Sequence, residues 1–110
     1  MIGLWTAEWA KNNSIEHTYI PDTESTNLYA KENFDSLKYP HLVLTDMQTA
    51  GTGRNTNKWL PTKNGEALYS TWCFSLDEAP SPITTARIGL ALYDSLVAAF
   101  SKKDLSIKAP

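Results

Sequence analysis

The feature that most constrains the fold is the run HLVLTD at residues 41–46. It is rich in strand-forming residues and contains no breaker, so it predicts a central β-strand. The run EALYSTWCFSL, residues 66–76, predicts a second and longer strand. Two such strands joined by a long, glycine-containing loop predict a sheet as the centre of the fold.

The second predicted strand has two unlike faces, because successive side chains of a strand point to opposite sides. One face would carry Ala67, Tyr69, Thr71 and Cys73. The other would carry Leu68, Ser70, Trp72, Phe74 and Leu76. We expect the second, more apolar face to meet the core. The first face has polar tips and would line a ligand pocket.

Two helices are expected before the central strand. The first dozen residues predict a short helix around Leu4, Trp5 and Trp9. A second helix should begin near Ser25, whose hydroxyl can cap the free backbone amides of the first turn. Its apolar face would consist of Ala30, Phe34 and Leu37. The bulky Trp5, Trp9 and Trp72 are expected to pack in the core or at its edge.

A long helix should follow the second strand. Ser81-Pro82 offers a cap and a proline at the first helical position, and Lys102-Lys103 would end the helix. Apolar residues recur at spacings of three and four, so the helix should lie on a sheet. They are Ile83, Ala86, Leu90, Tyr93, Val97 and Phe100. Gly89 within the helix suggests close packing.

Two short strands complete the prediction, at residues 17–20, ending at Pro21-Asp22, and at residues 105–108. Strands and helices therefore interleave. The predicted class is α/β (or α+β), with a mixed β-sheet flanked by helices.

The bulk composition narrows the class of protein. The 110 residues suit one domain, and a net charge of -2 gives no support for nucleic-acid binding. No run approaches the roughly 20 apolar residues of a membrane span, and no signal peptide is evident, so a cytoplasmic location is expected. Cys73 is the one cysteine and is expected to be a small buried hydrophobe. His17 and His41 suggest no metal site.

The loop DMQTAGTGRNTNKW, residues 46–59, carries two glycines and two cations. No glycine precedes Lys58, so the nucleotide P-loop pattern fails. The dinucleotide pattern fails as well, because Thr56 replaces its third glycine and a strand is expected downstream. Glycines allow close backbone approach to a ligand, and Arg54 and Lys58 can neutralise phosphate oxygens. A solvated surface turn remains the alternative.

The segment Ser25-Thr26-Asn27 also has two interpretations. It can simply cap a helix. Alternatively, its two hydroxyls and its amide can pair with a neutral ligand that both donates and accepts hydrogen bonds, such as a cyclic urea or amide.

In combination, the motifs ESTN, QTAGTGRNTNKW, GEALYST and IKAP resemble the catalytic domain of biotin protein ligases over roughly residues 15 to 110. The resemblance implies the biotin/lipoate protein ligase fold and a two-step reaction. Biotin attacks the α-phosphate of ATP, with Mg²⁺ expected to assist, and gives biotinyl-AMP. A lysine on the biotin carrier domain of a carboxylase then takes the biotinyl group.

The resemblance also implies roles for individual residues. Biotin would be bound by Ser25, Thr26, Asn27, Gln48, Gly51, Tyr69 and Thr71. The adenylate would be bound by Gly51, Gly53, Arg54 and Trp59. Arg54 and Lys58 would be the catalytic cations, and no residue is assigned to a metal.

Two departures from the family pattern stand out. Thr52 occupies a position where the family often has arginine or lysine. The element Ile107-Lys108-Ala109-Pro110 stops before the family's Asn-Asp pair. We therefore expect residues 1–110 to be the N-terminal part of a truncated catalytic domain whose C-terminal half is absent. Such a fragment should show no ligation by itself and should self-associate through an exposed sheet edge.

Two other functions stay open at this stage. A lipoate ligase or related acyl transferase shares the general fold. A small binding or interaction domain with a merely structural glycine loop is the non-catalytic alternative.

Overall fold

The computed structural model describes residues 1–53, 57–60, 66–100 and 104–106. The chain forms two compact units, Met1–Ser75 and Leu76–Pro110, and each is described by itself. The predictions for Arg54, for Lys102-Lys103 and for residues 107–110 lie outside the described residues.

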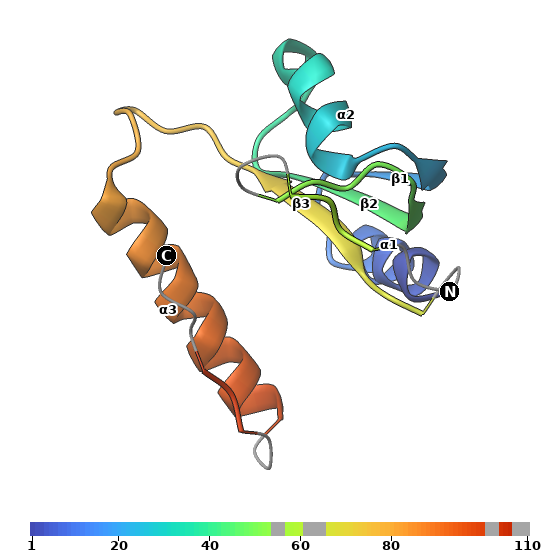
Figure 1. The fold of residues 1–110 in the computed structure, drawn as a ribbon. Coiled ribbons are helices and arrows are strands. Elements are labelled where there is room, and N and C mark those ends of the chain that lie inside the picture. The colour runs from blue at the N-terminus through green and yellow to red at the C-terminus, as the bar shows by residue number, and fades with distance from the viewer. Residues whose placement is uncertain (54–56, 61–65, 101–103, 107–110) are drawn as a thin grey trace. The chain divides into compact units, whose positions relative to one another are not determined.

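The first unit is built on a mixed three-stranded sheet in the order β1-β2-β3 (Figure 1). The strands are β1 (His17–Thr23), β2 (His41–Gln48) and β3 (Tyr69–Cys73). β1 runs parallel to β2, and β3 runs antiparallel to it. The predicted central strand is therefore confirmed, and most of its side chains are buried.

Two helices cover opposite faces of this sheet (Figure 1). Helix α1 (Ile2–Asn12) packs its alanines against Leu42 and Leu44. Helix α2 (Thr26–Glu32) packs Ala30 against Val43 and Cys73 on the other face. Neighbouring β2 residues alternate between the two small cores, which explains why this strand is apolar without a polar face. The predicted mixed sheet flanked by helices is confirmed.

Helix α1 contacts the sheet through small residues and not through its tryptophans. Gly3, Ala7 and Ala10 are buried, whereas Trp5 and Trp9 are 65% and 50% exposed. A Cβ added to Gly3 would lie 2.8 Å from the Thr45 carbonyl oxygen, so the helix approaches too closely for larger side chains there. The described structure therefore contradicts core packing of these two tryptophans, and only the expected position at the edge of the core remains for them.

The ends of several elements differ from the predictions, and β3 is not the longer strand that residues 66–76 predict, because only Tyr69–Cys73 pair with β2. β1 continues through Pro21 to Thr23, because Pro21 is exposed and takes no part in the pairing with β2, so its missing N–H costs no ladder bond. Helix α2 ends at Glu32, and a short 3-10 turn, η1 (Phe34–Ser36), follows. The predicted apolar face of this helix is only partly right: Ala30 is buried, but Phe34 is 52% exposed.

Strand β3 buries the face opposite to the one predicted. Tyr69 and Cys73 are buried, while Trp72 and Phe74 are about half exposed and stack on each other. The reason is the placement of the helices: α2 covers the Cys73 side, whereas α1 lies mainly on β1 and β2. Cys73 is the buried small hydrophobe that the sequence predicts, and burial raises the pKa of its thiol.

The second unit contains helix α3 (Pro82–Ala99), which begins where predicted. At its start the Thr84 hydroxyl accepts a hydrogen bond from the Ser81 backbone N–H at 3.2 Å, as in a capping box. The helix ends at Ala99, before the predicted lysines. Within this unit none of its residues is buried, and a Cβ at Gly89 would meet no atom within 4 Å, so the expected close packing is not found.

Residues 104–106, which include the first part of the predicted strand 105–108, form no strand. Among the described residues, no helix has the length and apolar character needed to cross a membrane.

Candidate functional site

A cavity of about 120 Å³ lies at one end of the sheet in the first unit. It is bounded by the start of α2, the end of β2, the start of β3 and the loop that joins these two strands. Its lining consists of residues 25–27, Gln48, Thr52, Trp59 and residues 68–71. None of these side chains carries a charge, and most of them end in a hydroxyl or an amide.

The start of α2 supplies the first wall of the cavity. Ser25 has extended backbone geometry, and its Oγ accepts a hydrogen bond from the Leu28 backbone N–H at 3.3 Å. The predicted helix cap is confirmed. The next residue, Thr26, is 3% exposed, so its hydroxyl is held in a fixed position beside the cavity.

Gln48, the last residue of β2, is tied to this helix start. Its side-chain carbonyl accepts hydrogen bonds from the Thr26 backbone N–H at 2.9 Å and from the Thr26 hydroxyl at 3.2 Å. A Cβ added to Gly51 would collide with the Gln48 amide nitrogen. A glycine at position 51 therefore lets the loop backbone lie directly against the Gln48 side chain.

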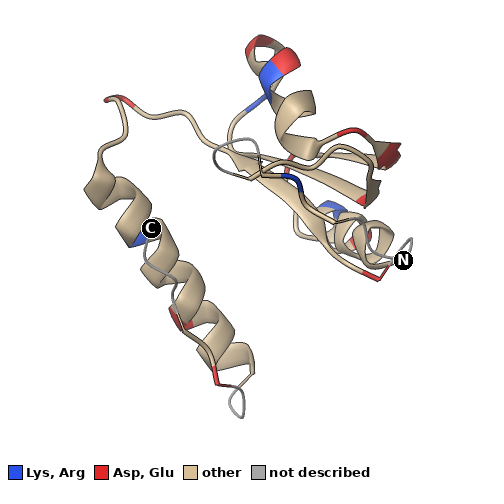
Figure 2. Ribbon diagram, in the orientation of Figure 1, with Lys and Arg blue, Asp and Glu red and all other residues tan. Residues whose placement is uncertain are grey.

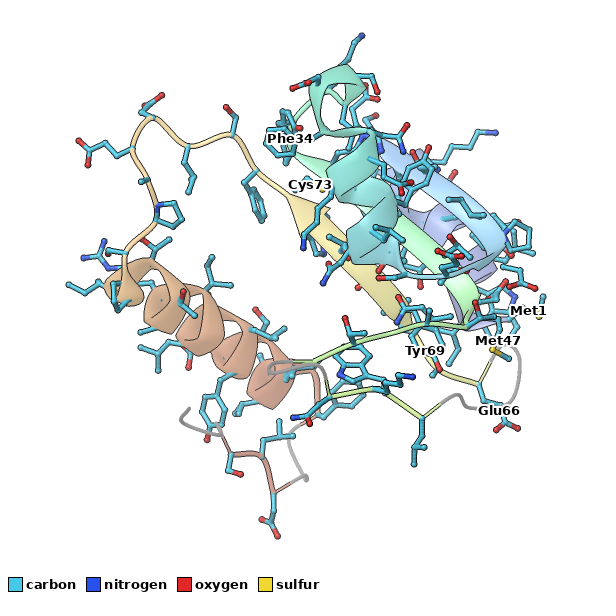
Figure 3. All side chains as sticks on the ribbon, turned by 45° about the horizontal axis from the view of Figure 1, so that its top comes forward. Met1, Phe34, Met47, Glu66, Tyr69 and Cys73 are labelled. Atoms are coloured by element: carbon cyan, nitrogen blue, oxygen red, sulfur yellow. The ribbon has the colours of Figure 1, made fainter. Side chains whose placement is uncertain are left out.

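Strand β3 supplies a further wall of the cavity. The Thr71 hydroxyl lies 2.8 Å from the Thr26 hydroxyl and donates to the Asn27 side-chain carbonyl at 2.5 Å. Tyr69 lines the cavity near one end of the strand, and Cys73 lies at the other end, toward Phe34 (Figure 3). The prediction that Tyr69 and Thr71 face a pocket together is confirmed.

The loop after β2 turns back on itself. Thr52 and Lys58 form an antiparallel bridge, and the Trp59 backbone N–H donates to the Gly51 carbonyl at 2.8 Å. β3 follows the loop, so the predicted strand-to-strand connection is confirmed and both nucleotide-loop alternatives remain excluded. Trp59 lines the cavity although 59% of it is exposed.

The predicted cations do not line this cavity in the described part of the chain. Lys58 is exposed and pairs with Thr52 across the turn. Arg54 lies outside the described residues. Figure 2 shows the described basic residues of the first unit dispersed over different elements. The described lining of the cavity therefore suits a neutral, hydrogen-bonding part of a ligand.

Sequence reasoning missed Leu68 and Ser70, which also line the cavity. Strand alternation assigned both to the opposite face of β3. The structure begins the strand at Tyr69, so these residues lie close to its end, where the walls of the cavity meet.

A second group of residues that the sequence analysis did not identify joins α1 to the sheet. The buried Asp46 carboxylate accepts hydrogen bonds from the Gly3 backbone N–H at 2.9 Å and from the Tyr19 hydroxyl. The hydrogen bond to Asp46, together with burial and the nearby negative charge, raises the pKa of Tyr19 to about 12. The position of the acidic Asp46 in an otherwise apolar strand was the sequence feature that could have indicated this contact.

The ring nitrogens of both histidines contact groups of the fold itself. His41 is buried, and its Nε2 lies 2.8 Å from the Thr18 hydroxyl. His17 Nδ1 lies 2.8 Å from the Ile15 carbonyl. The described residues contain no cluster of three histidine, cysteine or acidic side chains that could hold a metal ion.

Comparison with known proteins gives two findings. Residues 19–110 match the family described as the biotin/lipoate A/B protein ligase family, so α1 precedes the matched region. The fold is similar to that of the biotin acetyl coenzyme A carboxylase synthetase of Helicobacter pylori, solved with bound biotinylated ATP. The TM-score is 0.69 at 23% sequence identity. The similarity covers 84% of this chain and 46% of that one, so the chain spans less than half of the solved protein.

Proposed function

The chain belongs to the biotin/lipoate A/B protein ligase family, and from this premise we propose that its cavity binds the ring end of biotin. The whole protein would then be an ATP-dependent biotin–protein ligase that forms biotinyl-AMP. The observation that carries the proposal is the uncharged, hydrogen-bonding lining of the cavity, built from Thr26, Asn27, Gln48 and Thr71.

This lining favours biotin over lipoate. The ring of biotin contains a urea, which can pair with hydroxyls and amides, whereas the ring of lipoate is a dithiolane without a strong hydrogen-bonding group. Buried polar groups left without a partner by the wrong ligand are costly, about 1–3 kcal/mol each. A cavity with several such groups therefore discriminates against an apolar ring.

The loop beside the cavity would hold the phosphate end of the ligand. In the first step the biotin carboxylate oxygen attacks the α-phosphorus of ATP, and pyrophosphate leaves. The two reactants repel each other, so cations must neutralise them. We assign this role to Arg54 and Lys58, with Gly51 and Gly53 allowing the backbone to approach the adenylate and Trp59 shielding it.

Magnesium would accompany ATP. The described residues contain no cluster of acidic, histidine or cysteine side chains that could hold it, and the proposal gives magnesium no ligand from this chain.

In the second step a lysine amine of the partner attacks the acyl carbon of biotinyl-AMP, and AMP leaves. The partner we propose is the biotin carrier domain of a biotin-dependent carboxylase. The cytoplasmic location, the lack of nucleic-acid binding and self-association of the fragment stay predictions.

Calorimetric titration tests the proposed specificity. Biotin should give a saturable binding heat with the chain, and lipoate should give none at the same concentrations. Thr71→Val should weaken biotin binding, while Thr85→Val, an exposed position on α3, should not. Lipoate binding as tightly as biotin would overturn the choice of substrate.

A further inference from the structure

A second cavity lies where α1 ends and β1 begins, and we call it the helix-end pocket. Its volume is about 310 Å³. It is lined by Lys11, Ser14, Ile15, Glu16 and His17. Residues 25–27, which line the cavity described above, follow the other end of β1. The helix-end pocket is therefore separate from that cavity and has no part in the proposed function.

The backbone at the end of α1 has the hydrogen bonds of a Schellman motif. The Ile15 N–H donates to the Ala10 carbonyl at 2.9 Å, and the Ser14 N–H donates to the Lys11 carbonyl at 3.2 Å. The motif needs one left-handed residue, and Ser14 takes this position with a φ of 56°. Glycine is usual there, because a Cβ is disfavoured at positive φ. Serine is thus an unfavourable choice for the fold, and its hydroxyl lines the pocket.

The backbone fixes the hydrogen-bonding character of His17. Its Nδ1 lies 2.8 Å from the Ile15 carbonyl oxygen, which can only accept, so Nδ1 carries the hydrogen of the neutral ring. The lone pair is then on Nε2, which has no hydrogen-bond partner among the described residues. The half-buried imidazole therefore offers the pocket an acceptor.

The pocket also contains two opposite charges that are not paired. The Lys11 ammonium and the Glu16 carboxylate both line it, and in the part of the chain that the structure describes neither forms an ion pair. Lys11 would attract a simple anion, but Glu16 would repel it, and for a simple cation the signs are reversed. The partial negative charge at the C-terminal end of α1 further favours a cation near Glu16. A ligand that carries both charges would satisfy both side chains.

We propose that the helix-end pocket binds a small zwitterion with the chemistry of a free amino acid. The ligand carboxylate accepts hydrogen bonds from the Lys11 ammonium and the Ser14 hydroxyl, and the ligand ammonium donates to the Glu16 carboxylate and to His17 Nε2. Three of the four side chains, all except His17, are exposed, so water competes for the contacts. We therefore expect an affinity on the order of millimolar.

Three probes of similar size test the need for both charges. Alanine carries both, propionate lacks the ammonium and ethylamine lacks the carboxylate. In NMR titrations of the chain at neutral pH, alanine should shift the His17 ring and Ser14 amide signals saturably. The other two probes should bind about tenfold or more weakly, because each loses one charged contact. Equal binding of the three probes, or no saturable shift with alanine, would overturn the proposal.

Glu16→Gln tests the ammonium contact. Alanine affinity should fall about tenfold, while propionate should bind more tightly than it does to the wild type, because the repelling carboxylate is gone. Glu8→Gln removes the same charge at an exposed position of α1 outside the pocket and should change neither affinity. If the two variants behave alike, Glu16 does not contact the ligand and the proposal fails.

Ser14→Gly separates a ligand contact from a role in the fold. Glycine relieves the left-handed conformation, so the folding equilibrium constant measured by denaturant titration should rise about threefold. Alanine affinity should fall about fivefold, because the hydroxyl is lost. A variant that gains stability and keeps the wild-type affinity for alanine would contradict the proposal. Biotin affinity should be unchanged in these variants, so failure of this site is distinguishable from failure of the proposed function.

Discussion

The lining of the cavity can be divided into two parts that are built differently, a ring wall and a loop wall. The ring wall, made of residues 25–27, Gln48 and Thr71, is joined by side-chain hydrogen bonds, and its Thr26 and Gln48 are 3% and 7% exposed. The loop wall consists of residues 51–53 and 57–60, of which Thr52 and Trp59 line the cavity. Its described residues are joined to one another by the Thr52–Lys58 bridge and by backbone hydrogen bonds, and its Trp59 is 59% exposed. Fixed hydrogen bonds suit discrimination between rigid rings. Under the proposed function, a loop whose Trp59 is largely exposed would suit a wall that admits ATP and releases an acylated product.

The largest expected effect comes from the loop wall. Arg54→Gly removes the predicted phosphate cation and should lower the rate of adenylate formation by the whole ligase on the order of 10²–10³-fold. It should also let biotinyl-AMP escape and label lysines of unrelated proteins. Biotin affinity without ATP should hardly change, because the ring wall is intact. Pyrophosphate release and labelling of bovine albumin measure the two effects.

Lys58→Ala is the matched control for the loop wall, since it removes the other cation while leaving Arg54. It should lower the rate less and retain the intermediate. Wild-type retention of biotinyl-AMP by Arg54→Gly would contradict the phosphate role of the loop.

Gly51→Ala acts where the two walls meet. Its new Cβ must displace the Gln48 amide, whose carbonyl is bonded to Thr26, so biotin affinity should fall about tenfold. Gly53→Ala is the control: its Cβ would lie 3.2 Å from the Trp59 indole nitrogen, and none of its three nearest atoms belongs to the ring wall. If both variants bind biotin equally well, the walls are not separate in the way we describe.

Thr26→Val tests the ring wall alone. It removes the hydroxyl between Gln48 and Thr71, and the loss of one buried hydrogen bond should weaken biotin binding by about 1–3 kcal/mol. ATP affinity in the absence of biotin should stay near normal. Calorimetry with each ligand, with Thr85→Val as control, measures this; unchanged biotin affinity would remove Thr26 from the site.

The smallest effect is expected outside both walls. Tyr19→Phe removes the hydrogen bond to Asp46 and should lower the free energy of unfolding by about 1 kcal/mol at neutral pH, with no change in biotin affinity. The pKa of Tyr19 is raised from 10.0 to about 12, so its contribution is complete below pH 10 and is lost as the pH rises toward 12. Denaturant titrations at rising pH should show the difference between wild type and variant disappearing. A difference that persists above this range would exclude the Tyr19 hydroxyl as its source.

Much of the site could be predicted from local sequence. Ser25 before an apolar helical segment predicts a cap, and strand alternation places Tyr69 and Thr71 on one face; the structure confirms both. These are local features, because capping and alternation depend on residues that are neighbours in the chain. The resemblance to the ligase family, carried by motifs in order, is likewise confirmed by the family match.

The predictions that failed concern which face of a helix or strand is covered by another element. Trp5, Trp9 and Trp72 are apolar enough for a core, yet the described structure leaves them about half exposed or more. Burial depends on whether another element lies opposite, and a residue's own hydrophobicity cannot report that. For the same reason the wrong face of β3 was assigned to the core.

The sequence by itself determined the central strand, the capped helix starts, the glycine loop and the family. Only the tertiary structure decided that Gln48 and Thr71 meet the start of α2, and that their hydrogen bonds occupy both amide carbonyls of the cavity. The physical reason is the separation along the chain over which each interaction acts. Capping and alternation act over a few residues, whereas the direction of a hydrogen bond between Thr71 and Asn27 depends on how separate elements pack and on how many protons they share.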